Sequence, residues 1–242
     1  AMDGVWEGTE AYGAGRFGRA AVFNGASRIV VDAFKNFNWG TDFTLSLWFN
    51  RAGCDGNYQG IVNTGYHASG AWEVRMGREG GCTALGGGVV TASSDATWDS
   101  LGVSQGGTVP DAATDTWHHV VLTYDGATVN FFVDNANQGL STEDTGSIVQ
   151  VDVALYIGHA GPPKTNEYFT GSVDEVQVWS TSAGPDDVAK LFADPAGQES
   201  ACAGFVAGGL FKGEFYFGTE LPADDACTGA EGHGTPGDDY CY

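Results

Sequence analysis

The chain has 242 residues, 42% of them hydrophobic, and its 31 acidic against 10 basic side chains give a net charge of −21. This length suits one large domain, or one domain with a small appendix. The acidic balance argues against nucleic acid and anionic membrane surfaces as partners, because both are bound through Lys and Arg. No apolar run approaches the roughly eighteen residues needed for membrane insertion as a helix. The opening Ala1–Gly4 has neither a basic start nor an apolar stretch, so we expect a module trimmed from a longer secreted chain.

Most apolar stretches alternate with period two and are bounded by Gly, Asn or Asp, a pattern typical of strands and turns. After residues 117–124, Asp125-Gly126 supplies a hairpin turn before a returning strand. In chain order, strands are predicted at 20–23, 29–31, 43–49, 60–63, 72–76, 88–91, 117–124, 129–133, 154–157 and 172–179. Short strands at this spacing predict an all-β fold with two antiparallel sheets stacked as a β-sandwich.

The C-terminal quarter differs from the rest of the chain. One short helix is predicted at 185–192, where Pro185 and two acidic residues form the first turn and apolar residues follow at helical spacing. Residues 196–242 hold three of the five cysteines and end in an acidic, Gly-rich stretch. We interpret residues 1–195 as the sandwich domain and 196–242 as a disulfide-tied appendix or the start of a neighbouring module.

The order of the motifs resembles the laminin-G-like jelly-roll domains of the concanavalin A-like lectin/glucanase superfamily. Gly15–Gly25 is similar to the family's opening "G-x-FG-x-A-x-x-F-[DN]-G", and Phe43–Phe49 to its "FTISAW" strand. Trp117–Gly126 is similar to the central hairpin, and Phe169–Trp179 to "F-x-G-x-IDEV-x-[IV]-[YW]". The resemblance covers about residues 13–193, and it implies a jelly roll closed by the predicted helix.

The resemblance also implies a structural calcium ion. An Asp at the position of Asp174 often helps to bind calcium in such sandwiches, together with an N-terminal turn that Asn24 and Gly25 match. Calcium takes six to eight oxygen ligands, and Asp3 is a further candidate. The alternative is that Asp174 caps a turn or pairs with an Arg side chain.

The cysteines are Cys54, Cys82, Cys202, Cys227 and Cys241. Since no CxxC pair occurs, they argue against structural zinc and for disulfides in a secreted, extracellular protein. A bridge between Cys54 and Cys82 would close a loop of about 28 residues, worth about 3–4 kcal/mol by loop entropy. The alternative there is a pair of reduced buried thiols, and the pairing of the last three cysteines stays open.

Aromatic residues in predicted loops are candidates for ligand binding. Trp39 and Trp98 lie where a core does not demand them, Asp99 could hold sugar hydroxyls, and Tyr66-His67 could form a second wall. Stacking of sugar rings on these aromatic planes is the interpretation we favour for glycan recognition. The alternative is that the aromatic residues only hold long loops in place.

The sequence contains no recognisable catalytic constellation. No strand carries the E-x-D-x-x-E pattern that aims two carboxylates at one glycosidic bond. Glu143 and Asp144 are adjacent and would point to opposite faces of a strand, while His118 and His119 fall on a core strand. We therefore predict a secreted, calcium-stabilised glycan-binding or cell-adhesion module, lectin-like and without catalytic activity, whose partner is glycan or cell-surface material. The alternatives are a docking or structural module that contacts other extracellular protein domains, and a polysaccharide-active enzyme.

Overall fold

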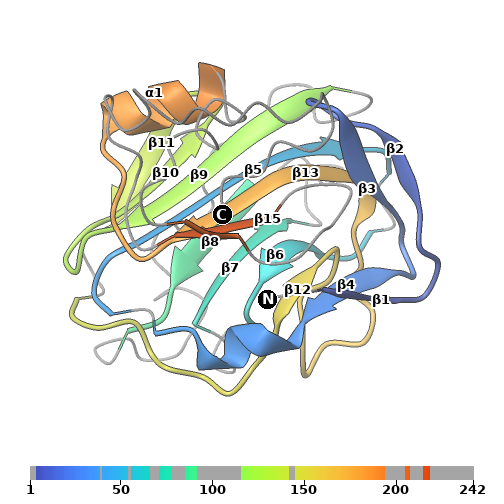
Figure 1. The fold of residues 1–242 in the computed structure, drawn as a ribbon, viewed down its shortest axis with the longest axis horizontal. Coiled ribbons are helices and arrows are strands. Elements are labelled where there is room, and N and C mark those ends of the chain that lie inside the picture. The colour runs from blue at the N-terminus through green and yellow to red at the C-terminus, as the bar shows by residue number, and fades with distance from the viewer. Residues whose placement is uncertain are drawn as a thin grey trace, which may run out of the picture.

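The fold is a sandwich of two β-sheets stacked face to face (Figure 1). It is known from a computed structural model, which describes residues 4–38, 40–53, 56–65, 71–77, 85–91, 116–141, 145–193, 205–207 and 215–218. The predicted all-β class is confirmed.

The six-stranded sheet is antiparallel throughout. Its strands lie in the order β1 (Val5–Glu7), β4 (Arg28–Val31), β12 (Leu155–Ile157), β6 (Gln59–Asn63), β7 (Trp72–Met76) and β8 (Leu85–Val89). The pairing of β6 with β7 shifts register between Gly60 and Val62, which places a β-bulge at Ile61.

The nine-stranded sheet has a main path of β11 (Ala136–Ser141), β10 (Val129–Val133), β9 (Trp117–Tyr124), β5 (Phe43–Arg51), β13 (Thr170–Trp179), β15 (Phe215–Gly218) and β14 (Phe205–Ala207). Off this path, β3 (Arg19–Asn24) pairs with β13, and β2 (Tyr12–Ala14) pairs with β3. All pairs are antiparallel except β13 with β15. Thus β3 pairs with the first half of β13 and β15 with the second half, and both β14 and β15 come from the segment after residue 195.

The core lies between the two sheets and follows from the alternation along their strands. On β5, Phe43 and every second residue after it up to Phe49 are fully buried, and on β7 Trp72, Val74 and Met76 belong to the same cluster. The rings of Phe43 and Trp72 meet across the sandwich with centroids 5.1 Å apart. Burial of this inner face, rather than any single contact, holds the sheets together.

All ten predicted strands are present, and β7, β9 and β10 have the predicted bounds. One boundary was wrong: the strand predicted at 88–91 is β8, at 85–89. The three glycines Gly86 to Gly88 are typical of a turn, but here they let strands approach closely, because a Cβ on Gly87 would lie 2.8 Å from the carbonyl oxygen of Glu73. The pattern also missed β1, β2, β11, β14, β15 and the short 3-10 helix Asp32–Asn36.

Helix α1 (Pro185–Ala193) confirms the predicted helix and packs on the outer face of the nine-stranded sheet (Figure 1). Phe192 stacks on Trp48 with ring centroids 5.5 Å apart, and its ring also contacts that of His119 in a tilted arrangement at 5.8 Å. His119 is buried, which lowers its pKa to about 3, and its Nε2 lies 2.8 Å from the hydroxyl of Ser46. His118 hydrogen-bonds Asp134, so both histidines have structural contacts here. Among the described residues, no helix has the length and apolar character needed to cross a membrane.

Candidate functional site

A row of opposed residues crosses the outer face of the six-stranded sheet. Each of the six strands contributes one residue, which lies directly opposite the residue of the neighbouring strand. From β1 to β8 these residues are Val5, Val30, Tyr156, Asn63, Glu73 and Gly88. Directly opposed residues project from the same face of a sheet. Since Trp72 and Val74 on either side of Glu73 point into the core, the row points away from it. The row changes from apolar on β1 to polar on β6 and β7.

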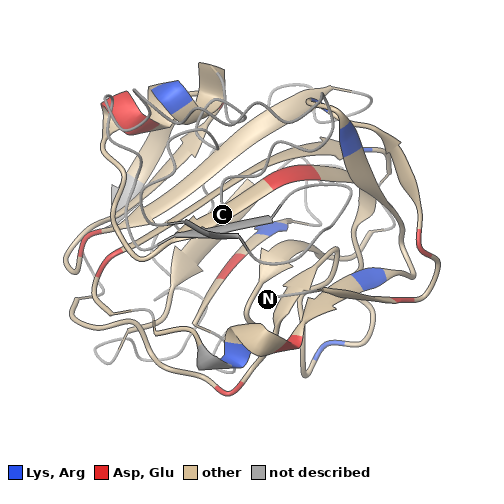
Figure 2. Cartoon of the chain, viewed as in Figure 1, with Lys and Arg blue, Asp and Glu red and all other residues tan. Residues whose placement is uncertain are grey.

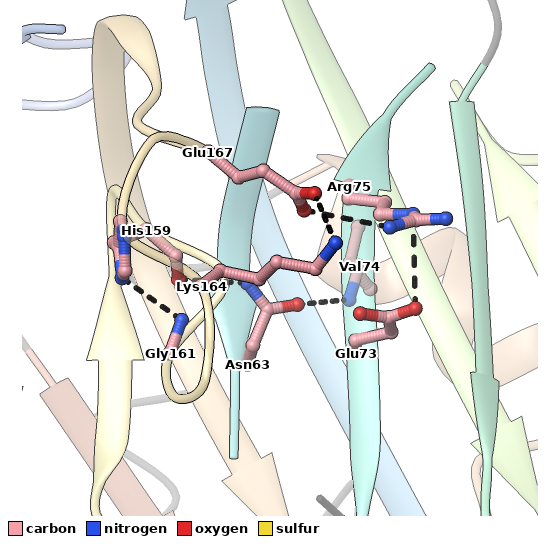
Figure 3. Close-up of polar contacts among 8 residues, drawn as sticks. All are labelled: Asn63, Glu73, Val74, Arg75, His159, Gly161, Lys164 and Glu167. Carbon is pink, nitrogen blue, oxygen red and sulfur yellow. Dashed lines mark hydrogen bonds and ion pairs between the residues drawn. The ribbon is translucent and has the colours of Figure 1, made fainter. Parts of the chain in front are cut away.

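Four charged residues gather at the polar end of this row, and we call Glu73, Arg75, Lys164 and Glu167 the charge cluster (Figure 3). Arg75 Nε lies 3.7 Å from Glu73 Oε1, and its Nη1 lies 3.5 Å from Glu167 Oε2. Lys164 Nζ lies 2.8 Å from Glu167 Oε1. Figure 2 shows acidic and basic positions together within β7, whereas most other charges lie at strand ends and turns. The cluster thus joins strand β7 to the 158–169 loop, the segment between β12 and β13.

Glu73 is the most perturbed carboxyl of the charge cluster. Burial raises its pKa to about 7 against the opposing attraction of Arg75, and Glu167 adds to the rise. Its side chain is 1% exposed. Below neutral pH the Glu73 carboxyl is therefore protonated, because taking a carboxylate out of water disfavours its charged form. The cluster then carries two cations and one carboxylate.

Backbone contacts hold the 158–169 loop against β6 and β7. Asn63 donates from Nδ2 to the carbonyl of His159 at 2.9 Å and accepts the Val74 N–H at 3.0 Å (Figure 3). The N–H of Gly60 donates to the carbonyl of Glu167 at 3.2 Å. A Cβ on Gly60 would lie 2.2 Å from the backbone nitrogen of Ala160, so only glycine admits the loop this close.

His159 is fully buried beside this loop. Its Nδ1 accepts the Gly161 N–H at 2.9 Å and lies 3.2 Å from Arg28 Nη1, which can only donate. We therefore assign the ring proton to Nε2. Burial, and secondarily the Arg28 charge, lower the pKa of His159 to about 4, so this imidazole stays neutral at ordinary pH.

Three half-buried tyrosines flank the polar groups, and each is held by a cationic or imidazole neighbour. The Arg75 guanidinium lies 4.2 Å from the ring centroid of Tyr58. The ring of Tyr168 lies 4.3 Å from that of His159, and Arg28 lies 5.2 Å from the ring of Tyr156. Partly exposed aromatic rings beside oriented donors and acceptors can stack on the apolar face of a sugar ring and pair with its hydroxyls.

Most residues predicted from the sequence to form sites lie outside the described residues. These are the aromatic loop candidates and their neighbours, Trp39, Tyr66, His67, Trp98 and Asp99, the possible calcium ligand Asp3, and the five cysteines Cys54, Cys82, Cys202, Cys227 and Cys241. The glycan-binding loops and the disulfides therefore stay predictions.

Asp174 and Asn24, predicted to share a calcium ion, are not brought together. Asn24 pairs with Thr170 on β13, four residues before Asp174, a separation of about 13 Å along a strand. The Asp174 carboxylate accepts the N–H of Phe17 at 3.0 Å and that of Glu175 at 3.1 Å, and donor dipoles of this sign oppose a cation. The arrangement does not fit a calcium ion between the Asn24-Gly25 turn and Asp174. Nor do the described residues contain any group of three or more His, Cys, Asp or Glu residues placed to hold a metal.

The charge cluster was missed by sequence reasoning. Glu73 and Arg75 alternate with core residues on β7, which is the ordinary pattern of a solvent-facing strand surface. Lys164 and Glu167 lie about ninety positions further along the chain and outside any motif. The sequence offered only one hint: basic residues are scarce in the chain, so each of them could have been considered as part of a site. Three of them, Arg28, Arg75 and Lys164, lie on this face.

Comparison with known proteins places the chain among sandwiches of this kind. Residues 23–189 match a family described as "Concanavalin A-like lectin/glucanases superfamily". Domain 4 of AbnA, a GH43 extracellular arabinanase from Geobacillus stearothermophilus solved in complex with arabinotriose, is 20% identical with a TM-score of 0.59, over 78% of this chain and 87% of that one. Botulinum neurotoxin type C, a toxin whose cell entry depends on interaction with two ganglioside molecules, gives a structure that is 10% identical with a TM-score of 0.55, over 84% of this chain and 48% of that one. The binding domain of botulinum neurotoxin serotype G is 9% identical with a TM-score of 0.52, over 82% and 48%. No curated protein sequence matches.

Proposed function

Because the chain belongs to the concanavalin A-like lectin/glucanases superfamily, we propose that it is a non-catalytic glycan-binding module of an extracellular protein, with its site on the outer face of the six-stranded sheet. The observation that carries this proposal is the charge cluster beside Tyr58, Tyr156 and Tyr168 on that face. The arabinotriose complex of a similarly folded domain supports a sugar as the ligand class.

The site is built as a binding surface on a rigid support. The tyrosine rings offer apolar planes, and the side chains that hold them are themselves fixed by β6, β7 and the 158–169 loop. Because these groups are ordered before the ligand arrives, little conformational entropy is lost on binding. We expect sugar rings to stack on the tyrosines, with hydroxyls paired to polar groups at the edge of the cluster.

The arrangement of the two glutamates supports binding over hydrolysis. A glycosidase needs one carboxyl group as acid and a second as nucleophile or base, both facing the same glycosidic bond. Here Arg75 lies between Glu73 and Glu167 and contacts both, and their side chains are only 1% and 6% exposed. A bound sugar would meet Lys164 and the tyrosines before either carboxylate.

Affinity electrophoresis on a panel of soluble polysaccharides tests the proposal. We expect retention by at least one polysaccharide, with affinity lowered about tenfold by Tyr58→Ala and by Tyr168→Ala, because each loses a stacking plane. Tyr12→Ala, which removes a half-buried tyrosine from β2 in the other sheet, is the matched control and should retain binding. No retention on any polysaccharide, or equal loss in all three variants, contradicts the proposal. Release of reducing sugar from any of them contradicts its non-catalytic part.

A further inference from the structure

The charged groups at the site are engaged with one another. In the charge cluster, Arg75 contacts both glutamates, at 3.7 Å and 3.5 Å, and Lys164 Nζ lies 2.8 Å from Glu167 Oε1. Arg28, on the same face, donates from Nε to Glu7 Oε2 at 2.7 Å. Each of these cations therefore has a carboxylate partner, and the two signs balance when every carboxyl group is ionised. The face offers a ligand neither sign of charge in excess.

The polar groups that stay open beside the charge cluster are uncharged. Tyr156 and Tyr168 are half-buried, and both contact the imidazole of His159, with ring centroids 6.4 Å and 4.3 Å from it. Within the part of the chain that the structure describes, neither of these phenolic hydroxyls makes a hydrogen bond. By contrast, the hydroxyl of Tyr12 in the other sheet accepts the indole N–H of Trp6 at 3.0 Å. Because a hydroxyl both donates and accepts, the two open phenols can pair with the hydroxyls of a sugar.

The surroundings of these phenols disfavour a charged ligand. The imidazole between them is neutral above acidic pH, because burial and then the Arg28 charge lower the pKa of His159 to about 4. The chain as a whole has a net charge of −21, which repels polyanions at long range. An ionic group on a ligand would lose its water shell at this face and would have to displace an existing ion pair to gain a countercharge. A neutral sugar pays neither cost.

We propose that the glycan bound at this face is neutral, with a sugar ring packed against Tyr156 or Tyr168 and sugar hydroxyls paired to their phenolic groups. This inference rests on the proposed function, because it names the ligand class of the same site. The charge cluster then acts as a support, since it ties the 158–169 loop, which carries Tyr168, to strand β7. Recognition itself uses aromatic planes and uncharged hydroxyls.

The test compares neutral polysaccharides with acidic forms of the same chains at pH 8, where Glu73 is ionised. Polygalacturonate and alginate are each measured beside a carboxyl-reduced preparation, in which the uronates have become neutral hexoses, and linear arabinan is a further neutral probe. We expect at least one neutral polymer to be retained, and any retained reduced form to bind about tenfold more tightly than its parent uronate.

Salt gives a second measure of the same property. Raising it from about 0.05 M to about 0.5 M should leave the affinity for the neutral polymer unchanged, because no ion pair forms on binding. Retention of uronates only, equal binding of both forms, or a loss of neutral-polymer binding in salt overturns this inference and leaves the proposed function standing. Retention of no polymer overturns both.

Two conservative substitutions test the assigned hydroxyls. Tyr156→Phe and Tyr168→Phe keep the aromatic plane and remove only the phenolic O–H, so at least one of them should lower affinity for the neutral polymer about three- to tenfold. Tyr12→Phe, which removes the hydroxyl that pairs with Trp6 in the other sheet, is the matched control and should bind like the unaltered protein. Urea unfolding of each variant checks that the fold is kept. Unchanged affinity in both site variants, or an equal loss in the control, overturns the assignment.

Discussion

Replacement of Glu73 by Gln isolates the cost of burying a carboxylate on the outer face of a sheet. Burial raises the pKa of Glu73 from its ordinary value of 4.5 to about 7. In the unfolded chain the carboxyl group ionises near its ordinary value, so between these two pH values the folded chain binds more protons. Stability must then fall as the pH rises through this interval, because the state that releases protons is favoured.

The magnitude follows from the two pKa values. Each pKa unit is worth about 1.4 kcal/mol, so the raised pKa of Glu73 lowers the stability of the fold by about 1 kcal/mol at pH 5, where the carboxyl is ionised only in the unfolded chain, and by about 3 kcal/mol at pH 8. Glu73→Gln keeps the shape and removes the charge, so we expect it to stabilise the protein by these amounts. For a chain of this size the gain at pH 8 corresponds to a rise of about 6–12 °C in melting temperature.

Urea titrations of both proteins at pH 5 and pH 8, followed by tryptophan fluorescence, give the two differences directly. The two proteins are compared at the same pH because two buried histidines also make stability depend on pH. Burial lowers the pKa values of His119 and His159 to about 3 and about 4, so the protein becomes less stable as the pH falls below 6.5, which is opposite to the effect of Glu73. Their contributions are equal in both proteins and cancel. Glu10→Gln, at an exposed site, is the control and should change little. A Glu73→Gln protein that is no more stable at pH 8, or that gains equally at both pH values, would refute the reasoning.

Three further outcomes follow from the described contacts. Asp174→Asn should lower stability by about 1–3 kcal/mol, because an amide cannot accept both backbone N–H groups. We expect the same loss in calcium and in chelator. A calcium-dependent rise in melting temperature that Asp174→Asn removes would instead support a calcium site at Asp174. Gly60→Ala should cost about 1–3 kcal/mol and raise hydrogen exchange in the 158–169 loop, while Gly53→Ala, whose Cβ would make an ordinary contact at 3.4 Å, should not. Phe192→Ala should cost about 2 kcal/mol through lost packing on Trp48, read as faster exchange in α1; unchanged exchange there would contradict the anchoring role.

The fold could be predicted because its causes are local. The β9–β10 hairpin follows from two alternating strands joined by Asp125-Gly126, where Asp125 accepts the N–H of Thr128 at 2.6 Å and Gly126 has a φ of +86°. Neither feature depends on the rest of the chain. The start of β8 was misplaced because its glycines are required by a neighbouring strand, a cause that acts across the sheet.

The candidate site could not be predicted for the same kind of reason. The outward position of Glu73 and Arg75 is visible in the alternation of β7, but their burial is not, because it depends on segments remote in the chain. Glu167 reaches Arg75 only because the loop after β12 folds back over β6, and that path depends on the absence of a side chain at Gly60. The separation of Asn24 from Asp174 could not be predicted for a related reason: the two residues lie on paired strands, but four positions out of register.

On both outer faces of the sandwich, buried residues pack against aromatic rings, but only one of these aromatic surfaces is covered by the chain itself. On the nine-stranded sheet, His119 and Trp48 pack under Phe192 of α1, so the chain's own helix occupies the aromatic surface. On the six-stranded sheet, His159 packs against Tyr168 and Arg75 against Tyr58, and both tyrosines are only half-buried. A buried Glu73 makes the protein less stable than a neutral residue at the same position would. Packing alone therefore does not explain why a carboxyl group stands there. A face that retains such a residue beside half-buried tyrosines is better explained by ligand binding than by a contribution to stability.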